Sequence, residues 1–333
     1  MAALTKLWPS LEMLTMVTPH THVVSAHEDG AIEQAVEQLI EGNLVALPTE
    51  TVYGLAADAL NATAVAKIYE AKGRPSNNPL ICHVADIEMA ERYVTVSKIS
   101  ALLMKNFWPG PLTLVLPQKP DTNIPATVSA NLATLAVRCP ATKTTHQIIK
   151  TLDRPIAAPS ANTSGKLSPT SAEDVLETLE GRLPLVLDGG NTSVGIESTI
   201  LGIEDDKVTL LRPGTITSDE ISDTINLPVY DRDSSQITAP GQLKSHYAPN
   251  ANVRLNVTKK HEGEILVGFA DVVGDISLSP EGNLKNAARD LFSVLRQADK
   301  LNPSAIAVAP IPHKGIGIAI NDRLNRAAAP RNS

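Results

Sequence analysis

Short apolar runs alternate with helix-like segments over the first two thirds of the chain, and this alternation limits the possible folds more than any other feature. Such alternation is typical of an α/β domain, in which helices cover a sheet. Because the order is not a regular strand–helix–strand ladder, we expect a twisted mixed sheet. The expected strands are 44–47, 80–84, 112–116, 132–137, 155–158, 185–187, 198–202 and 208–211. The expected helices are 32–40, 61–71, 142–152 and one that follows residue 170.

Residues 226–250 interrupt the pattern. They are polar, contain Pro and Gly, and show no periodicity, which is typical of a linker. A strand at 265–270, a helix at 284–298 and a strand at 305–309 then predict a small Rossmann-like α/β domain. A chain of 333 residues also exceeds what one core usually holds. The predicted organisation is a flexible leader (1–24), a catalytic domain (25–225), a linker or lid (226–250) and a small domain (251–333).

Composition excludes several classes of protein. An apolar fraction of 43% argues against bulk disorder, and a net charge of -7 leaves room only for weak, local contact with RNA. No apolar run is long enough to span a membrane, and the N-terminus lacks a signal-peptide pattern. Cys82 and Cys139 have no CxxC spacing, which fits a reducing cytoplasm. His20, His22 and His27 could bind a metal, although a solvated leader is the favoured interpretation.

The familiar nucleotide and hydrolase signatures are absent from the sequence. It contains no GxxxxGK[ST], HExxH or GxSxG pattern. Gly315-Ile316-Gly317 is only a fragment of a dinucleotide fingerprint and is more typical of a turn. The candidate chemistry therefore lies in polar and cationic residues at the ends of strands and helices.

Two cations flank a helix terminator. Gly73 and Pro75 should end the helix, so that Lys72 and Arg74 extend from it on the same side of the chain. A polyphosphate needs such paired charge. The alternative is a pair of solvated cations near a helix C-terminus.

Two further stretches crowd polar groups beside apolar runs. Residues 158–171 contain Ser160, Asn162 and Ser168, and the helix N-terminus expected at Thr170 would favour an anion. An ordinary capped loop is the alternative. Within residues 47–60, Thr49, Glu50, Thr51 and Tyr53 offer polar groups before Gly54, although a plain strand-to-helix turn is the favoured interpretation of this stretch alone.

Three single charged or titratable residues adjoin or interrupt apolar strands. Arg138 and Arg212 each end a strand, where a charge must be paired, exposed or functional. His83 lies inside an apolar run, where a hydrogen-bonded core histidine is the alternative to a ligand-binding one.

Together these stretches are far more specific than any one of them. In order, the chain contains PTETVYGLAADA, KGRPSNNPL, WPGPLTLVL, AVRCP, APSANTSGKLSPT, DGG…GIESTI and LLRPG. This order resembles the YrdC-like family, and the later GQLKSHYAPN with a small α/β domain resembles its longer two-domain branch, the threonylcarbamoyl-AMP synthases. The resemblance covers residues 25–328.

The resemblance implies an enzyme that joins L-threonine, bicarbonate and ATP into threonylcarbamoyl-AMP and pyrophosphate. Other proteins then transfer the threonylcarbamoyl group to an adenosine of tRNA. No carboxylate cluster stands out in the sequence as a metal site, so we expect Mg²⁺ to arrive on the ATP phosphates.

The resemblance further implies a role for individual residues. The L-threonine positions are Thr51, His83, Arg138, Ala158 and Ser198. The nucleotide and phosphate positions are Lys72, Arg74, Asn78, Thr134, Ser160, Asn162, Ser168 and Arg212, with Tyr247 reaching back from the linker as part of a lid. Lys72, Arg74, Ser160 and Asn162 are the expected catalytic set.

Three rival interpretations stay open. A YrdC-like protein could bind double-stranded RNA or tRNA without adenylation activity, although the net acidity and the absence of aromatic stacking motifs weigh against it. A carbamoyl-phosphate-handling enzyme should carry zinc-finger and acylphosphatase regions, which the sequence lacks. A dead regulatory homologue should have lost the catalytic set.

Overall fold

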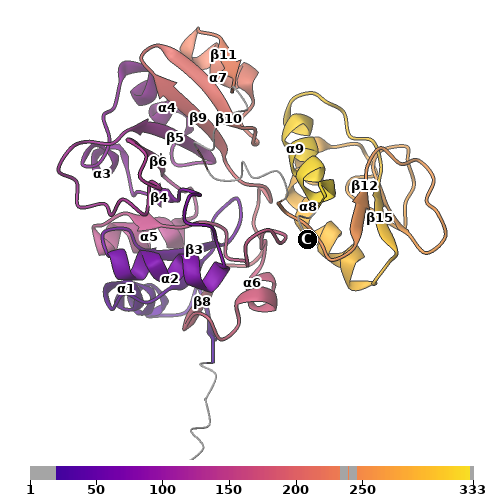
Figure 1. The fold of residues 1–333 in the computed structure, drawn as a ribbon, viewed down its shortest axis with the longest axis horizontal. Helices are drawn as coiled ribbons and strands as arrows, with labels where there is room; N and C mark the ends of the chain where they lie inside the picture. The colour runs from indigo at the N-terminus through magenta and orange to yellow at the C-terminus, as the bar shows by residue number, and fades with distance from the viewer. Residues whose placement is uncertain (1–19, 233–238, 240–245, 331–333) are drawn as a thin grey trace, which may run out of the picture.

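The computed structural model describes residues 20–232, residue 239 and residues 246–330, and these form two sheets with their helices. Figure 1 shows the two parts side by side, with the later residues in the smaller part. The larger sheet has eleven strands in the order β1-β8-β2-β3-β7-β4-β6-β5-β9-β10-β11. Its strands are β1 (His22–Ser25), β2 (Val45–Leu47), β3 (Gly54–Asp58), β4 (Ile81–His83), β5 (Leu112–Pro117), β6 (Thr134–Arg138), β7 (Ile156–Ala157), β8 (Leu185–Asp188), β9 (Thr199–Glu204), β10 (Lys207–Arg212) and β11 (Val229–Asp231).

The larger sheet is mixed, as the irregular alternation predicts. Strand β5 runs parallel to β9 and antiparallel to β6, while β4 runs parallel to β6 and antiparallel to β7. Short central strands with fully buried side chains place their ends close to one another. Loops that are far apart in the chain therefore meet at one edge of the sheet.

Seven helices lie beside this sheet in the described residues, and five of them begin at a residue whose side chain caps the first turn. The seven helices are α1 (Ala31–Ile40), α2 (Ala62–Lys72), α3 (Ile87–Glu91), α4 (Lys98–Phe107), α5 (Lys143–Leu152), α6 (Ala172–Leu179) and α7 (Ser218–Ile225). Asn61 caps the start of α2 by accepting from the Ala64 amide, and Gly73 ends it at φ 59°. A left-handed residue at this position suits glycine. The chain consequently turns immediately after Lys72.

Strands β3 and β1 of the larger sheet differ from the sequence-based expectations, as does β11, which is described below. Strand β3 lies where residues 47–60 permit a polar turn followed by a helix, and it pairs with both β2 and β7. Its composition, GLAAD, has weak strand propensity, but all five residues are buried, so tertiary packing decides. Strand β1 begins at His22, inside the expected leader, and pairs in parallel with β8. Residues 1–19 of that leader lie outside the described residues.

The second sheet contains four strands, β12 (Asn252–Arg254), β13 (Ile265–Gly268), β14 (Ile276–Ser277) and β15 (Ala305–Val308). Their order is β12-β15-β13-β14, and every pair is parallel. Helices α8 (Leu284–Lys300) and α9 (Ile316–Ala328) pack against each other beside it. The expected small α/β unit is confirmed, while the domain boundaries stay predictions.

Strand β11 lies within the segment expected to be a linker, so its first residues extend the larger sheet. Residues 233–238 and 240–245 of that segment lie outside the described residues. Across the part of the chain that the structure describes, no helix has the length and apolar character to cross a bilayer.

Candidate active site

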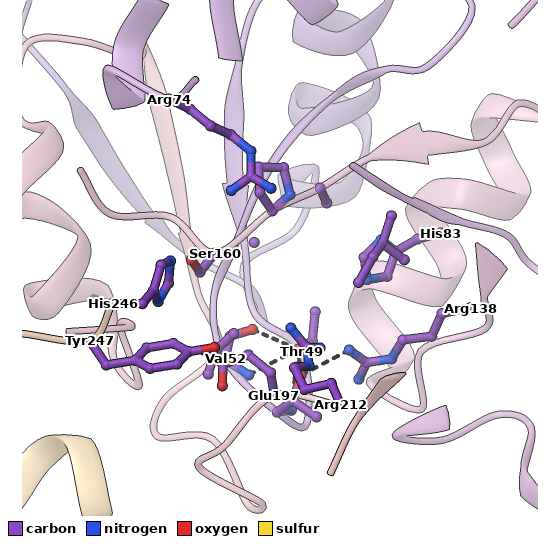
Figure 2. A pocket seen from close by; sticks show the side chains of 15 residues that line it. Thr49, Val52, Arg74, His83, Arg138, Ser160, Glu197, Arg212, His246 and Tyr247 are labelled. Carbon is purple, nitrogen blue, oxygen red and sulfur yellow. Dashed lines mark hydrogen bonds between the residues drawn. The ribbon is translucent and has the colours of Figure 1, made fainter. Parts of the chain in front are cut away.

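A cavity of about 50 Å³ lies at the edge of the larger sheet where loops from distant parts of the chain meet. Figure 2 shows its side chains converging from several strand ends and from the linker. Three arginines, two histidines and one glutamate line it together with hydroxyl groups. The full lining is Thr49, Thr51, Val52, Gly54, Arg74, Ile81, His83, Arg138, Ala158, Pro159, Ser160, Glu197, Arg212, His246 and Tyr247.

Arg138 is held on three sides. At the end of β6, its Nη2 donates to Glu50 Oε1 at 2.5 Å and its Nη1 donates to Thr51 Oγ1 at 2.9 Å. Its Nε donates to the carbonyl of Gly110 at 3.2 Å. Glu50 is fixed in turn by the Ala141 amide, which donates to Oε2. The guanidinium is therefore oriented before any ligand binds.

Lys72 and Arg74 converge, although not in the extended arrangement expected from the sequence. Lys72 is the last residue of α2 and Gly73 is left-handed, so the chain bends between the two cations. The Lys72 ammonium donates to the carbonyls of Ser160 and Asn162, each at 2.5 Å. Arg74 donates to the carbonyls of Asn78 and Pro79. Both side chains are buried rather than solvated, which contradicts the surface alternative.

Burial changes the acid–base properties of this cationic pair. Desolvation, reinforced by the neighbouring Arg74, holds the pKa of Lys72 well below its usual value. Desolvation also lowers the pKa of Arg74, to about 10. A bound anion would offset both decreases in pKa, because a nearby opposite charge favours the charged forms of Lys72 and Arg74 that desolvation disfavours.

The loop after β7 supplies Ser160 and Asn162. Ser160 forms an isolated bridge with Gly54, which keeps the loop against the start of β3. The Asn162 amide donates to the carbonyls of Thr163 and Lys166, so it closes the loop on itself. The following helix has Ser171 as its N-cap rather than Thr170, because Ser171 accepts from the Asp174 amide while Thr170 binds the Asp174 side chain.

Glu197 is the carboxylate that the expected site lacked. Ser168 donates to Glu197 Oε1 at 2.5 Å, and Arg323 of α9 donates to Oε2 at 3.0 Å. Burial acts to raise the pKa of Glu197, but Arg323 and Arg212 reverse this, and the net pKa is lowered. Nearby, Arg212 donates to the carbonyl and the Oγ of Ser198.

Three buried side chains at or next to the cavity carry polar atoms without partners among the described residues. His83 and His246 line the cavity with Nδ1 unbonded, and Asn78 is buried with both side-chain amide atoms unbonded. Burial, followed by the charge of Arg138, lowers the pKa of His83 to about 3, so its ring is neutral near pH 7. Buried polar atoms of this kind are usually paired, which indicates places for ligand or water.

The linker contributes two aromatic side chains to the cavity. The rings of His246 and Tyr247 pack edge to face with their centroids 4.0 Å apart. The centroid of the Tyr247 ring also lies 5.4 Å from that of Phe292 in α8. Tyr247 has φ 60°, a strained conformation for a bulky residue. Desolvation lowers the pKa of His246 to about 3 and raises that of Tyr247 to about 12.

The structure brings most of the predicted site residues together. Thr51, Arg74, His83, Arg138, Ala158, Ser160, Arg212 and Tyr247 line the cavity. Lys72, Asn162, Ser168 and Ser198 contact lining residues without lining it themselves. Asn78 and Thr134 are not among the lining residues, and Thr134 begins the strand that Arg138 ends.

Sequence reasoning did not assign several residues of the site. Glu50 and Thr49 lie inside the polar stretch that was singled out, and Glu197 lies inside GIESTI, so each had a local signal. Arg323 had none, because its helix contacts the cavity only through the tertiary fold.

Two family models match this chain over adjacent segments. A model for Sua5, YciO and YrdC proteins, described as telomere recombination, matches residues 37–214. A second, described as the C-terminal domain of threonylcarbamoyl-AMP synthase, matches residues 216–329.

Individual relatives agree along nearly the whole length. The threonylcarbamoyl-AMP synthase of Pyrococcus abyssi is 40% identical, covering 91% of this chain and 96% of its own. The Bacillus subtilis enzyme of the same name is 42% identical, with 91% and 94% covered. The crystal structure of P. abyssi Sua5 complexed with L-threonine superposes with a TM-score of 0.84 at 37% identity, covering 92% of this chain and 98% of that one.

Proposed function

The chain belongs to the two-domain Sua5 branch of the threonylcarbamoyl-AMP synthase family, and we propose that its cavity joins L-threonine, bicarbonate and ATP into threonylcarbamoyl-AMP and pyrophosphate. The observation that carries this proposal is the convergence of Arg74, Arg138 and Arg212 on one cavity. One amino-acid carboxylate and a triphosphate require several cations in one place, and these three come from the loop after α2, the end of β6 and the end of β10. Charge neutralisation and positioning are what such phosphoryl chemistry needs most.

The L-threonine half of the cavity is proposed around Arg138. A guanidinium has five N–H groups, and contacts with Glu50, Thr51 and Gly110 use three of them. The other two would bind the threonine carboxylate as a fork. His83 Nδ1 would accept a hydrogen bond from the substrate. The proposed set is Thr51, His83, Arg138, the main chain of Ala158, and Ser198.

The nucleotide half is proposed around Lys72, Arg74 and Arg212. Each is buried, and burial makes the free cation costly, so an incoming phosphate would stabilise the charged forms. Ser160 and Asn162 belong to the loop whose carbonyls hold the Lys72 ammonium. The remaining proposed nucleotide contacts are Asn78, Thr134, Ser168 and Tyr247.

The proposed reaction has two steps. The threonine amine first adds to the carbon of bicarbonate with loss of water, which gives a carbamate. A carbamate oxygen then attacks the α-phosphorus of ATP, and the bond to the bridging oxygen breaks as pyrophosphate leaves. Lys72, Arg74 and Arg212 would offset the charge that develops on the phosphate oxygens.

Mg²⁺ is proposed to arrive with the ATP phosphates. Both carboxylates beside the cavity are engaged by arginines, Glu50 by Arg138 and Glu197 by Arg323. A protein site for a divalent cation uses carboxylates that are free to bind the metal, and these two are not. The arginines and lysine around the cavity suit the oxygens of a phosphate that already carries Mg²⁺. Mg²⁺ would supply further neutralisation of the triphosphate.

His246 and Tyr247 are proposed to form a lid. A cavity of about 50 Å³ is well below the ~300 Å³ of small ligand pockets, so ATP requires these side chains to move. The strained backbone of Tyr247 would favour such a rearrangement. Closure over the product would shield its mixed anhydride from water.

One incubation tests the proposal. The purified protein, ATP, Mg²⁺, L-threonine and labelled bicarbonate should give threonylcarbamoyl-AMP by mass analysis, and omission of any substrate should abolish it. Formation of the adenylate without RNA would exclude the RNA-binding alternative. Transfer of the threonylcarbamoyl group from this product to tRNA would be the work of partner proteins. If ATP stays intact with all substrates present, the proposed function is wrong.

A further inference from the structure

One arginine of the smaller part reaches into the wall of the cavity. Arg323 lies on α9, and its side chain has 0% relative exposure. Its Nε donates to Glu197 Oε2 at 3.0 Å and its Nη2 donates to the Glu197 carbonyl at 3.3 Å. Its Nη1 donates to the Pro213 carbonyl at 2.8 Å and to Asp322 Oδ2 at 2.9 Å. The guanidinium therefore holds two loops of the larger sheet, one before β9 and one after β10.

Each of these loops carries a proposed substrate contact next to the group that Arg323 holds. Ser198 follows Glu197, and Arg212 precedes Pro213. Arg212 also donates to the carbonyl and the Oγ of Ser198, so the two loops meet beside the cavity. A planar guanidinium donates in fixed directions and so sets the spacing of its acceptors. Movement of Arg323 would therefore move both substrate contacts.

The same guanidinium faces the linker. Its central carbon lies 5.7 Å from the centre of the Tyr247 ring, within the range of a cation–π interaction. Phe292 of α8 packs against the same ring at 5.4 Å. Tyr247, which lines the cavity, thus has two partners that belong to the smaller part.

Charge balance gives Arg323 a second effect. Glu197 is a buried carboxylate among cations, and Arg323 is the charge that most lowers its pKa against the opposing effect of burial. A buried pair that loses one member leaves the other charge uncompensated. Without Arg323, the Glu197 carboxylate would be drawn toward Arg212, and the proposed phosphate contact would be displaced.

We infer that Arg323 is a positioning residue of the active site, through which the C-terminal part completes the cavity. It does so by holding Glu197 in the loop before β9, Pro213 in the loop after β10, and the ring of Tyr247. This rests on the proposed function for its catalytic consequence. Arg323 does not line the cavity, so it acts through these neighbours.

The test compares Arg323→Met with Arg289→Gln. Arg289 is an exposed arginine of α8 whose guanidinium pairs only with its neighbour Asp290 among the described residues. For Arg323→Met we expect a loss in kcat/KM for ATP of about 10- to 100-fold, as for a displaced contact remote from the chemistry. The KM for L-threonine should rise by less than that for ATP, because Arg138 is held separately and Ser198 is the one proposed threonine contact that the change would displace. Arg289→Gln should match the wild type in both.

A double-variant cycle separates positioning from general destabilisation. Glu197→Gln and Arg323→Met should each lower kcat/KM for ATP, and the combined variant should be little worse than either, because both break one interaction. Should the two losses multiply, or should the KM for L-threonine rise in parallel with that for ATP, the inference fails.

Hydrogen exchange provides a readout that needs no catalysis. Arg323→Met should speed exchange in residues 196–199 and 212–215 while leaving β2 unchanged. If the methionine variant does not fold, Arg323→Lys, which keeps the charge but loses the fork, should show the same local change. Unchanged exchange in both loops would overturn the inference. Inactive wild-type protein would instead overturn the proposed function, and the exchange result would still decide the role of Arg323.

Discussion

Arg138 and Glu50 form a buried ion pair, 2.5 Å from Nη2 to Oε1, between the end of β6 and the loop after β2. The two residues are 88 positions apart in the chain. Their side chains are 4% and 9% exposed, so neither is screened by solvent. Glu50 thus orients the guanidinium that is proposed to bind the threonine carboxylate.

Glu50→Gln should weaken L-threonine binding. The amide retains the shape but removes the charge that fixes Arg138, so the KM for L-threonine should rise by about tenfold or more while the KM for ATP changes little. Initial rates of pyrophosphate release against each substrate measure this. A matched control is Glu173→Gln, an exposed residue in the first turn of α6. Equal changes in both KM values would contradict the assignment.

Lys72→Ala should lower turnover by about two orders of magnitude or more, as when one charge-stabilising donor is lost. Its ammonium holds the loop that carries Ser160 and Asn162, so both charge and loop geometry are removed. Lys105→Ala, on the exposed last turn of α4, is the control. Pyrophosphate release that remains near the wild-type rate would show that Lys72 has no such role.

Arg74→Ala should have a similar effect on turnover, about a hundredfold, for the same reason. Unlike Lys72, Arg74 lines the cavity directly, so the KM for ATP should rise as well. Arg92→Ala is the control, because Arg92 is exposed and pairs with the exposed Asp153. A folded Arg74→Ala variant with the wild-type kcat and the wild-type KM for ATP would contradict the assignment.

The folded state should become less stable as the pH drops below neutral, partly because of His83. Its folded pKa is about 3, below the ordinary histidine value of 6.5, so between these values the unfolded chain binds a proton that the folded chain does not. Stability from this residue is therefore fully present above pH 6.5 and declines as the pH falls toward 3. The slope is about 1.4 kcal/mol per pH unit for one proton.

His83→Asn isolates this contribution. We expect the free energy of unfolding of this variant, measured by urea denaturation between about pH 7 and pH 4, to depend less steeply on pH. The slope should be smaller by about 1.4 kcal/mol per pH unit, the contribution of one proton. His246, which is lowered to about 3 by burial, should give a comparable change in a separate His246→Asn variant. Parallel stability curves for variant and wild type would rule out the buried neutral histidine.

Gly195→Ala should loosen the contact between the two parts of the molecule. Gly195 has φ 79°, and an added Cβ would lie 2.0 Å from the Arg289 carbonyl oxygen in α8. Gly190 in the same loop has φ 77° and open space around it. Gly190→Ala should therefore cost only about 1 kcal/mol of backbone strain, while Gly195→Ala should cost more and lower the activity. Similar melting temperatures for the two variants would count against the close contact.

The local order of elements could be read from the chain because it depends on short-range physics. Runs such as 81–83 and 112–117 are apolar and β-branched enough to specify strands, and Asn61 with Gly73 specifies the ends of α2. The resemblance in seven motifs also named the family correctly, since those motifs retain the residue types that the chemistry requires.

Pairings between distant residues depended on the tertiary structure. Strand β3 forms because β2 and β7 flank it, and its residues have too little intrinsic strand propensity to predict it. Arg323 reaches Glu197 across 126 positions, and a contact of that separation leaves no periodic trace in the sequence. The chain by itself determined which chemical groups are present and which segments are helical or extended. Only the fold decided which of these groups share a desolvated cavity, because burial and charge pairing are properties of neighbours in space.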